Sequence, residues 1–381
     1  MRALVLYDRQ KFEVRDVKAP QPGPNDVLVR IDAVGLCGTD FHIYGGHANY
    51  HTDERGQPVP LTVVPQILGH EFCGEIVEVG PNISDLAEGD RVLVDQGINC
   101  SSRHREVLCE YCATGNSHQC AEYAEHGITG LQGALAEVVS VPGRNAVKIS
   151  SGIDPQHAVM SEPLGCIIHA SNAAAKAQSR YRFDGDSKIR NVLVLGAGPA
   201  GLLFVQYLRK VIGFDGLLMV SEPNRGRRFL AERYGATTID PRATDLVSAV
   251  KQLTDGERVH YLIEAAGIAS TFKEMPGLLR KQATVLLYGH GQHGVDLGVM
   301  NNIQFLEPAL VAPIGASGGF DTDGRPAIYR RALELVESGT IDASGIITNL
   351  YRRLEDVPAA FARDHTEDGY IKGVVVLGTS Q

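Results

Sequence analysis

The sequence predicts an α/β protein built from two parts, a β-rich, antiparallel, barrel-like part and a doubly wound parallel sheet. Up to about residue 160, short strand-like runs lie between Gly and Pro, and helical periodicity is sparse. From about residue 190, short apolar runs alternate with helical segments, as they do in βαβ units. At 381 residues, the chain is long enough for two domains that each bury a core.

The first part is predicted from runs of apolar and β-branched residues that alternate only in part. They are Val27 to Val34, Phe72 to Val79, Arg91 to Val94 and Ala134 to Val141. Such residues favour strands, and turns rather than crossover helices join antiparallel neighbours. An antiparallel, barrel-like arrangement follows.

The second part begins after Glu162. Val192 to Leu195 is a bare apolar run that ends at Gly196, and Pro199 to Val211 is predicted as the helix behind it. Uninterrupted apolar strands are typical of parallel sheets that are covered on both faces. We expect further strands at 217–220, 261–265 and 284–288 and a helix at 227–234, followed by a tail with a helix at 326–338 and strands at 346–348 and 373–377.

Composition argues against several classes of function. The chain is 44% apolar and 21% charged, as in an ordinary soluble globular protein, and its formal net charge of −9 disfavours nucleic acid or an anionic membrane as a partner. No run reaches the roughly 18 apolar residues of a membrane span, and the N-terminus lacks the pattern of a signal peptide. The seven cysteines fit poorly with a fully paired disulfide framework, so we expect a cytoplasmic protein.

One set of residues has the chemistry of a catalytic zinc site. Cys37, His70, Glu71 and Glu162 offer a thiolate, an imidazole and carboxylates, which hold a four-coordinate zinc with room for substrate. Spacing alone does not establish the site, because only a fold can bring such distant residues together. Taken singly, a His beside a Glu is usually a hydrogen-bonded pair, and a lone cysteine is usually a core residue.

A second motif predicts a dinucleotide site. The turn Gly196-Ala197-Gly198-Pro199-Ala200-Gly201 follows a predicted strand and opens a helix, whose N-terminus favours a pyrophosphate. Glu222 follows about twenty residues later, where a carboxylate binds the ribose hydroxyls and favours NAD. Arg225 keeps NADP as the alternative, because a guanidinium there would accept a 2′-phosphate; otherwise it stacks on adenine or stays solvated.

Together these motifs resemble those of the zinc-dependent medium-chain alcohol and polyol dehydrogenases over nearly the whole chain. The matching segments are C-G-T-D-F-H at 37–42, G-H-E-x2-G-x5-G at 69–80, E-P-L at 162–164 and the turn at 196–201. The resemblance implies a GroES-like catalytic domain at 1–162 and 314–381, and a Rossmann dinucleotide-binding domain at 163–313. It also implies a catalytic zinc on Cys37, His70 and either Glu162 or Glu71.

The resemblance extends to a structural zinc lobe. Cys109, Cys112 and Cys120 match the last three of its four thiolate ligands, a closed set that leaves no room for substrate. The family's first ligand would be a cysteine at position 106, but this residue is Glu106. We expect Cys100 to be the fourth ligand. Glu106, His104 and a metal-free reduced lobe are the alternatives.

The implied reaction is reversible hydride transfer between an alcohol carbon and the nicotinamide. The zinc lowers the pKa of the bound alcohol. The resemblance assigns a proton relay to Thr39 and His42, and Asp40 is expected to orient His70. Their structural alternatives are a turn cap for Thr39 and Asp40 and an exposed loop position for His42.

A glutamate as third ligand is typical of the polyol and sugar branch, and the polar segment 44–65 offers further groups for binding hydroxyls. We therefore expect a sugar, sugar acid, polyol or cyclitol as substrate. The alternatives are a threonine-type amino-alcohol dehydrogenase, a nucleotide-binding homologue without catalysis and a zinc-free quinone reductase. The segment Leu297 to Ala316 corresponds to the family's pairing region, so a homodimer or homotetramer is expected.

Overall fold

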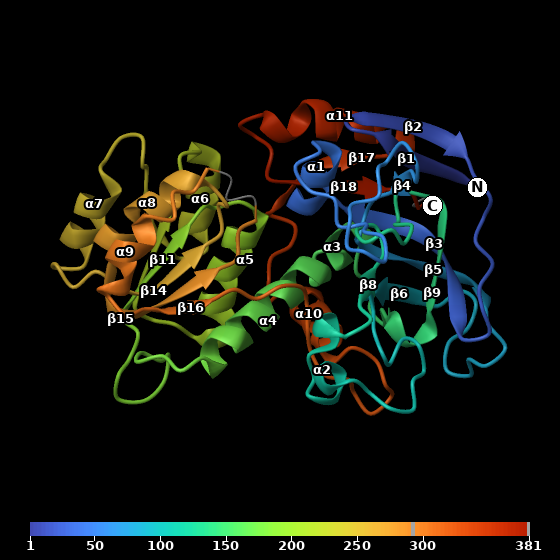
Figure 1. Ribbon diagram of the computed structural model, residues 1–381, viewed down its shortest axis with the longest axis horizontal. Coiled ribbons are helices and arrows are strands. Elements are labelled where there is room, and N and C mark those ends of the chain that lie inside the picture. The colour runs from blue at the N-terminus through green and yellow to red at the C-terminus, as the bar shows by residue number, and fades with distance from the viewer. Residues whose placement is uncertain (291–293, 379–381) are drawn as a thin grey trace. The chain divides into compact units, whose positions relative to one another are not determined.

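The structure is a computed structural model that describes residues 1–290 and 294–378. By its contacts, the chain divides into two compact units (Figure 1). Unit 1 comprises Met1–Gly165, Ala316–Gly339 and Ile347–Gln381, and unit 2 comprises Cys166–Gly315 and Thr340–Ile346. The domain limits that we predict, with an insert at 163–313, remain a proposal.

Unit 1 is built around a seven-stranded sheet in the order β10-β6-β5-β3-β18-β17, with β9 also paired to β3. All of its pairs are antiparallel except that of β17 with β18. The strands are β3 (Asp26–Gly35), β5 (Glu71–Val79), β6 (Arg91–Val94), β9 (Val138–Pro142), β10 (Ala146–Lys148), β17 (Ile347–Tyr351) and β18 (Lys372–Val376). The sheet thus joins strands of the first part to strands of the tail.

Smaller elements complete unit 1. A three-stranded sheet has the order β2-β1-β4, and β7 pairs with β8. These strands are β1 (Arg2–Asp8), β2 (Lys11–Asp16), β4 (Gln66–Ile67), β7 (Gly97–Ile98) and β8 (Ala124–Glu125). The helices are α1 (Gly38–Tyr44), α2 (Glu110–Ala113), α3 (Pro155–Ala158), α10 (Ala327–Glu337) and α11 (Val357–Ala362). Apolar side chains of β1, β3, β5 and β9 form the core.

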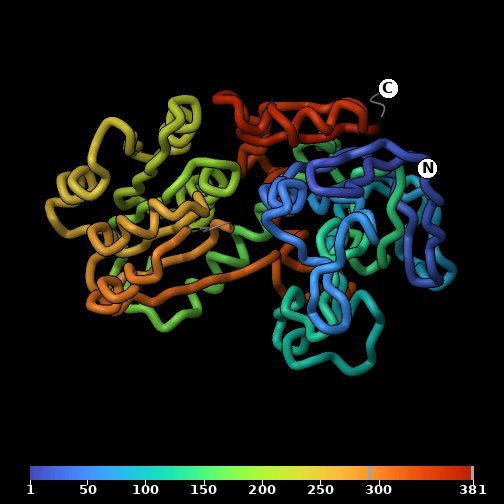
Figure 2. The backbone as a smooth tube through the Cα atoms, turned by 45° about the horizontal axis from the view of Figure 1, so that its top comes forward, coloured from blue at the N-terminus to red at the C-terminus, as the bar shows by residue number. Residues whose placement is uncertain are grey.

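Unit 2 contains a six-stranded sheet in the order β13-β12-β11-β14-β15-β16, and every pair in it is parallel. Most of its backbone is coloured from green to orange in Figure 2. Its strands are β11 (Asn191–Leu195), β12 (Leu217–Ser221), β13 (Thr237–Ile239), β14 (Val259–Glu264), β15 (Leu279–Leu287) and β16 (Ala309–Val311). Its helices are α5 (Pro199–Tyr207), α6 (Arg225–Arg233), α7 (Leu246–Leu253), α8 (Ala269–Leu278) and α9 (Val299–Gln304). The predicted α/β class, with a mainly antiparallel β-rich part and a parallel sheet, is confirmed.

Three local expectations differ from the structure. The strand expected from Ala134 begins only at Val138, because the backbone of 134–135 bonds instead to that of 68–69. The helix from Pro199 is α-helical to Tyr207 and then widens into a π-helical turn that ends at Gly213, where φ is +72°. Helix α4 (Ser161–Lys176) was not expected at all.

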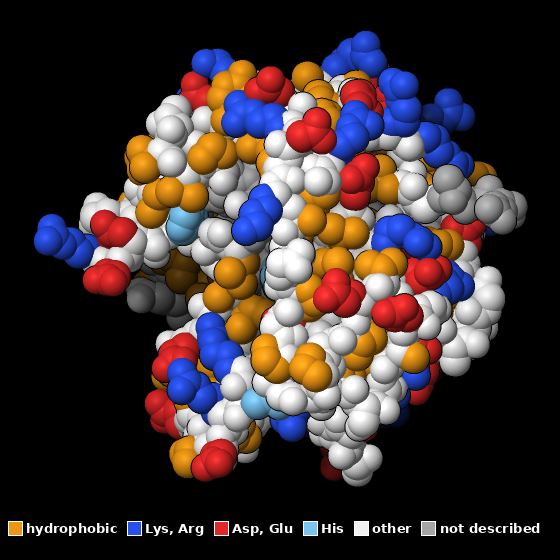
Figure 3. All heavy atoms as spheres, turned by 90° about the vertical axis from the view of Figure 1, so that its right-hand side faces the viewer, with side chains coloured by type: hydrophobic (Ala, Val, Ile, Leu, Met, Phe, Trp, Pro, Cys, Tyr) orange, Lys and Arg blue, Asp and Glu red, His pale blue; other side chains and the backbone are white. Residues whose placement is uncertain are grey.

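None of the helices in the described ranges is long and apolar enough to cross a membrane. On the face drawn in Figure 3, acidic and basic side chains are interspersed, and apolar side chains lie in small groups.

Candidate functional site: a metal-ligand cluster and a dinucleotide turn

The pairing of β3 with β5 brings the predicted catalytic ligands together. Gly35 of β3 lies opposite Glu71, the first residue of β5, so that Cys37, which caps α1, comes close to His70. The ligand atoms of Cys37, His70 and Glu71 all lie within 4.8 Å of one another. A Cβ at Gly35 would lie 2.1 Å from Glu71 Oε2, so any side chain at this position would displace the carboxylate of Glu71.

Asp40 holds the Cys37–His70 side of this cluster. It is fully buried in α1, and its carboxylate accepts hydrogen bonds from the backbone N–H of Cys37 (2.9 Å) and of Gly69 (3.2 Å). Its Oδ1 lies 3.3 Å from Nδ1 of His70. Burial lowers the pKa of His70, but the negative charges of Asp40 and Cys37 raise that pKa well above its usual value. The arrangement is suited to holding the imidazole in one orientation.

Glu71 has a buried partner that the sequence analysis missed. Nζ of Lys372, the first residue of β18, lies 2.5 Å from Glu71 Oε2, and both side chains are almost fully buried. Burial lowers the pKa of Lys372, but the charge of Glu71 raises it above the usual value. A buried charge needs such a partner. A lysine at the start of an otherwise apolar strand was the only signal in the sequence.

Glu162 lies outside the cluster of Cys37, His70 and Glu71 but close enough to interact with it electrostatically. It is the second residue of α4 and is buried, and its Oε1 accepts a 2.9 Å hydrogen bond from Nε2 of Gln96. Burial and then the charge of Glu71 raise the pKa of Glu162 to about 7, while His70 lowers it. Glu162 and Glu71 therefore both remain candidates for the third ligand.

The two residues of the predicted proton relay lie on α1. Thr39 is half-buried, and its Oγ1 lies 3.8 Å from Cys37 Sγ. His42 is also half-buried, and its ring centroid lies 6.5 Å from that of His47. The exposed-loop alternative for His42 does not apply, because the residue belongs to a helix.

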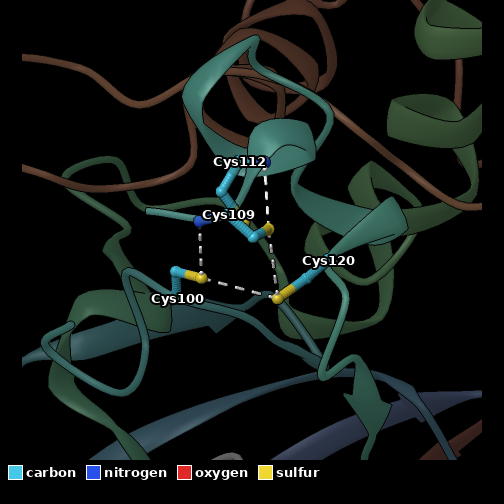
Figure 4. A group of neighbouring side chains, drawn as sticks. All are labelled: Cys100, Cys109, Cys112 and Cys120. Atoms are coloured by element: carbon cyan, nitrogen blue, oxygen red, sulfur yellow. Dashed lines mark hydrogen bonds between the residues drawn. The ribbon is translucent and has the colours of Figure 1, made fainter. Parts of the chain in front are cut away.

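The four cysteines of the predicted lobe converge (Figure 4). The Sγ atoms of Cys100 and Cys120 are 3.7 Å apart, and those of Cys109 and Cys120 are 4.0 Å apart. Four thiolates about 2.3 Å from a tetrahedral zinc would lie about 3.8 Å from one another. Backbone N–H groups of Ala121 and Cys112 lower the pKa of Cys109 to about 6, which favours the thiolate that binds metal.

The alternatives for the fourth lobe position do not join the group. Glu106 and His104 are exposed, and neither belongs to the four-residue cluster. His104 lies in the turn between Cys100 and Cys109, with a φ of +51°.

The glycine turn of unit 2 has the predicted form. It follows β11, φ at Gly196 is +94°, and a Cβ at Gly201 would lie 2.0 Å from the carbonyl oxygen of Gly196. At Gly198, which caps α5, a Cβ would meet no atom within 4 Å. Helix α5 begins with Pro199 and Ala200. The open space before its N-terminus suits a pyrophosphate.

Glu222 lies beside this turn, directly after β12. It is buried; Oε2 accepts from the backbone N–H of Ala197 (2.7 Å), and Oε1 accepts from that of Asn224 (2.8 Å). Each carboxylate oxygen keeps a second lone pair with which it can accept from a ribose hydroxyl. Arg225 is exposed at the start of α6, and Arg227, two residues later, is half-buried.

Comparison with known proteins agrees with these sites. Family models match residues 23–151 as an alcohol dehydrogenase GroES-like domain and residues 199–338 as a zinc-binding dehydrogenase. The chain is 31% identical to L-threonine 3-dehydrogenase of Pyrococcus furiosus over 352 residues, which cover 92% of this chain and 90% of that protein. The chain belongs to the zinc-binding medium-chain dehydrogenases.

Two further relatives extend over almost the whole dehydrogenase. L-galactonate-5-dehydrogenase of Escherichia coli is 29% identical over 378 residues, which cover 99% of both chains. A solved structure of a proposed zinc-binding dehydrogenase of Sinorhizobium meliloti, bound to NADP, is 32% identical, covers 98% of both chains and gives a TM-score of 0.78. The family, the two-part fold and the assignment as an enzyme are thereby confirmed.

The residues of the dehydrogenase fit both zinc and a dinucleotide, the metal and the cofactor of its family. The thiolate, imidazole and carboxylate of the Cys37 cluster, together with the four gathered cysteines, are zinc donors by type and by distance. The glycine turn offers backbone N–H groups at the start of a helix, as a dinucleotide requires.

The sequence analysis missed two polar residues near the cluster, Gln96 and Glu125. Gln96 follows β6 and donates to both Glu162 and Glu125 at 2.9 Å. Tyr50 belongs to the polar segment 44–65 that the sequence analysis offered for binding hydroxyls, and burial and then the charges of Cys37 and Glu125 raise its pKa. These residues come from distant segments, so no local motif connected them.

Proposed function

We propose that the dehydrogenase oxidises one secondary hydroxyl of a sugar, sugar acid, polyol or cyclitol and transfers the hydride to NAD, with NADP as the alternative. The observation that carries this proposal is the hydrogen-bonded set beside the Cys37 cluster, formed by the buried Gln96 and Glu162 with the half-buried Glu125. Buried polar groups of this kind discriminate strongly in favour of substrates that offer hydroxyls to bind.

In this proposal, Cys37 and His70 hold the zinc with Glu162 or Glu71. When bound, the zinc supplies a Lewis acid for the alcohol oxygen, and the nicotinamide supplies the hydride acceptor. Asp40 keeps the imidazole of His70 oriented. Thr39 would accept the proton of the substrate hydroxyl as it gives its own proton to His42, which would pass that proton outward.

The turn at 196–201 holds the dinucleotide, with Gly196, Gly198 and Gly201 in the roles given above. Glu222 binds the ribose hydroxyls, which favours NAD. The positive charges of Arg225 and Arg227 nearby support NADP as the alternative, as does the NADP bound to the Sinorhizobium meliloti relative.

A threonine-type dehydrogenase is the second candidate. The Pyrococcus furiosus relative acts on L-threonine, and the carboxylate of Glu125 beside the cluster would attract the ammonium group of an amino alcohol. A substrate panel separates the two candidates.

The test is reduction of NAD or NADP, followed at 340 nm, with sugars, sugar acids, polyols, cyclitols and L-threonine. We expect turnover of a polyhydroxylated substrate and two zinc ions per chain. Cys37→Ser should lower the rate by at least about 1000-fold, because the Lewis acid is worth several kcal/mol, and should remove one zinc. Cys166→Ser, a matched cysteine outside both metal groups, should keep both zinc ions and the activity.

Turnover of L-threonine alone would favour the second candidate. The proposed reaction would be contradicted if no substrate were oxidised and the chain held a single zinc that Cys37→Ser retains. That zinc would then belong to the four-cysteine lobe.

We also propose that the chain forms a homodimer or homotetramer through 297–316. Leu297 and Phe305 are 75% and 83% exposed, and Leu310 is 43% exposed on β16, the edge strand of the parallel sheet. Ile303, by contrast, is buried in the core of unit 2. Exposed apolar residues along a sheet edge favour association. A monomeric mass by light scattering would contradict the proposal.

A further inference from the structure

Hydrogen bonds connect helix α10 to Glu162 through one glutamine. Oη of Tyr329 donates to Oε1 of Gln96, and Nε2 of Gln96 donates to Glu162 and to Glu125, at 2.9 Å each. Tyr329, Gln96 and Glu162 are 0%, 1% and 4% exposed. Because solvent hardly reaches them, the protein itself determines the orientation of these groups.

The orientation of the Gln96 amide follows from its neighbours. An amide has one acceptor end and one donor end with two N–H groups, and here two carboxylates face the donor end. Reversing the amide would turn its oxygen toward both carboxylates and exchange two charge-assisted hydrogen bonds for repulsion. Tyr329 supplies the hydroxyl donor that satisfies the acceptor end, and so it stabilises the productive orientation.

Separate contacts hold the backbone of Gln96. Nδ2 of Asn145 donates to the carbonyl oxygens of Asp95 (2.7 Å) and Gly97 (2.8 Å), on either side of Gln96. The N–H of Gly97 donates to Oδ1 of Asp95 at 2.8 Å. Loss of the Tyr329 hydroxyl would therefore leave the main chain in place and affect the side chain of Gln96.

We propose that Tyr329 is a positioning residue of the metal centre, which acts through Gln96 to fix the carboxylate of Glu162. This inference rests on the proposed function, in which Glu162 is a zinc ligand. Gln96 engages one of the two carboxylate oxygens, and as a neutral donor it leaves the negative charge of Glu162 for a cation. Partners that orient metal ligands typically affect metal affinity by about 10- to 100-fold.

The experiment compares three variants of the full-length zinc-loaded enzyme. Tyr329→Phe removes only the hydroxyl, Gln96→Leu removes the amide, and the double variant removes both. Tyr234→Phe is the matched control, because its buried hydroxyl donates to Asp342 within unit 2 (3.1 Å). The main readout is the rate at which a chelator removes the zinc that Cys37→Ser lacks, and the second is the visible absorption of the cobalt-substituted site.

We expect Tyr329→Phe to lose this zinc about 10-fold faster than the wild type and to shift the cobalt bands, while the lobe zinc leaves at an unchanged rate. If Tyr329 acts through Gln96, the double variant loses zinc no faster than Gln96→Leu alone. The proposal is wrong if Tyr329→Phe matches Tyr234→Phe, or if the effects of the two single changes multiply in the double variant.

Failure of this inference differs from failure of the proposed function. If the wild type turns over a polyol and Tyr329→Phe releases zinc normally, only the positioning role is wrong. If the wild type holds zinc at Cys37 but oxidises no alcohol, the substrate assignment is wrong and the zinc-release rates still decide the role of Tyr329. A wild type with no zinc that depends on Cys37 would overturn both.

Discussion

The four-cysteine lobe and the Cys37 cluster gather metal-ligand side chains in opposite ways. The lobe takes four identical thiolates from the single stretch 100–120, and their spacing matches the edges of a zinc tetrahedron. The cluster takes Cys37 from the start of α1, His70 and Glu71 from the start of β5, and its neighbour Glu162 from α4.

The supports of the two groups differ as well. In the cluster, Asp40 lies against His70, Lys372 pairs with Glu71, and Gln96 holds Glu162. In the lobe, the hydrogen bonds that reach the sulfurs come mainly from nearby backbone N–H groups. A closed set of thiolates needs only its metal, whereas a centre that keeps a position for substrate depends on side chains that orient each ligand.

The largest expected effect tests the dependence of the lobe on its metal. Cys112→Ser should abolish zinc binding in the lobe and unfold 100–120 locally, because a structural zinc contributes of the order of 10 kcal/mol in small zinc-folded peptides. Limited proteolysis should then cut within this stretch, and zinc content should fall by one per chain. An intact, protease-resistant lobe without zinc would show that protein contacts alone hold it.

A smaller effect tests the protein support of the cluster. Lys372→Met should lower the free energy of unfolding by about 3–5 kcal/mol, because it leaves the buried carboxylate of Glu71 without a counter-charge. Urea denaturation measures the change. Lys372→Arg keeps the charge and should recover much of the stability. If the methionine variant is as stable as the wild type, Glu71 does not need this partner.

The smallest effect is expected from the rejected lobe ligands. Glu106→Gln and His104→Ala change exposed side chains outside the cysteine group. The zinc content should therefore equal that of the wild type, and the free energy of unfolding should stay within about 0.5 kcal/mol of the wild-type value. Zinc loss in either variant, measured by elemental analysis, would mean that Cys100 is not the fourth ligand.

The same contrast explains what could be predicted from the sequence. The lobe is one local motif, so Cys100 could be picked out as a replacement although the expected position holds Glu106. The glycine turn is local too, and its order of strand, turn and helix was predictable. Both depend on residues that stay neighbours in the fold because they are neighbours in the chain.

The supports of the cluster could not be found in this way. Tyr329 and Gln96 are 233 positions apart, and Lys372 and Glu71 are 301 positions apart. The sheet that joins the tail to the first part brings Lys372 to Glu71, and helix α10 of the tail brings Tyr329 to Gln96. Helix α4 was missed for another reason, since Gly165 and a run of polar residues near its middle weaken the helical signal.

The pairing of Glu71 with Lys372 bears on how the protein is made. Lys372 follows Glu71 by 301 positions, so the ribosome makes it long after Glu71. The strand that carries Lys372 can pair with β3 only after the segment between them has emerged. The buried carboxylate of Glu71 therefore gains its counter-charge only after the nucleotide-binding segment has been made.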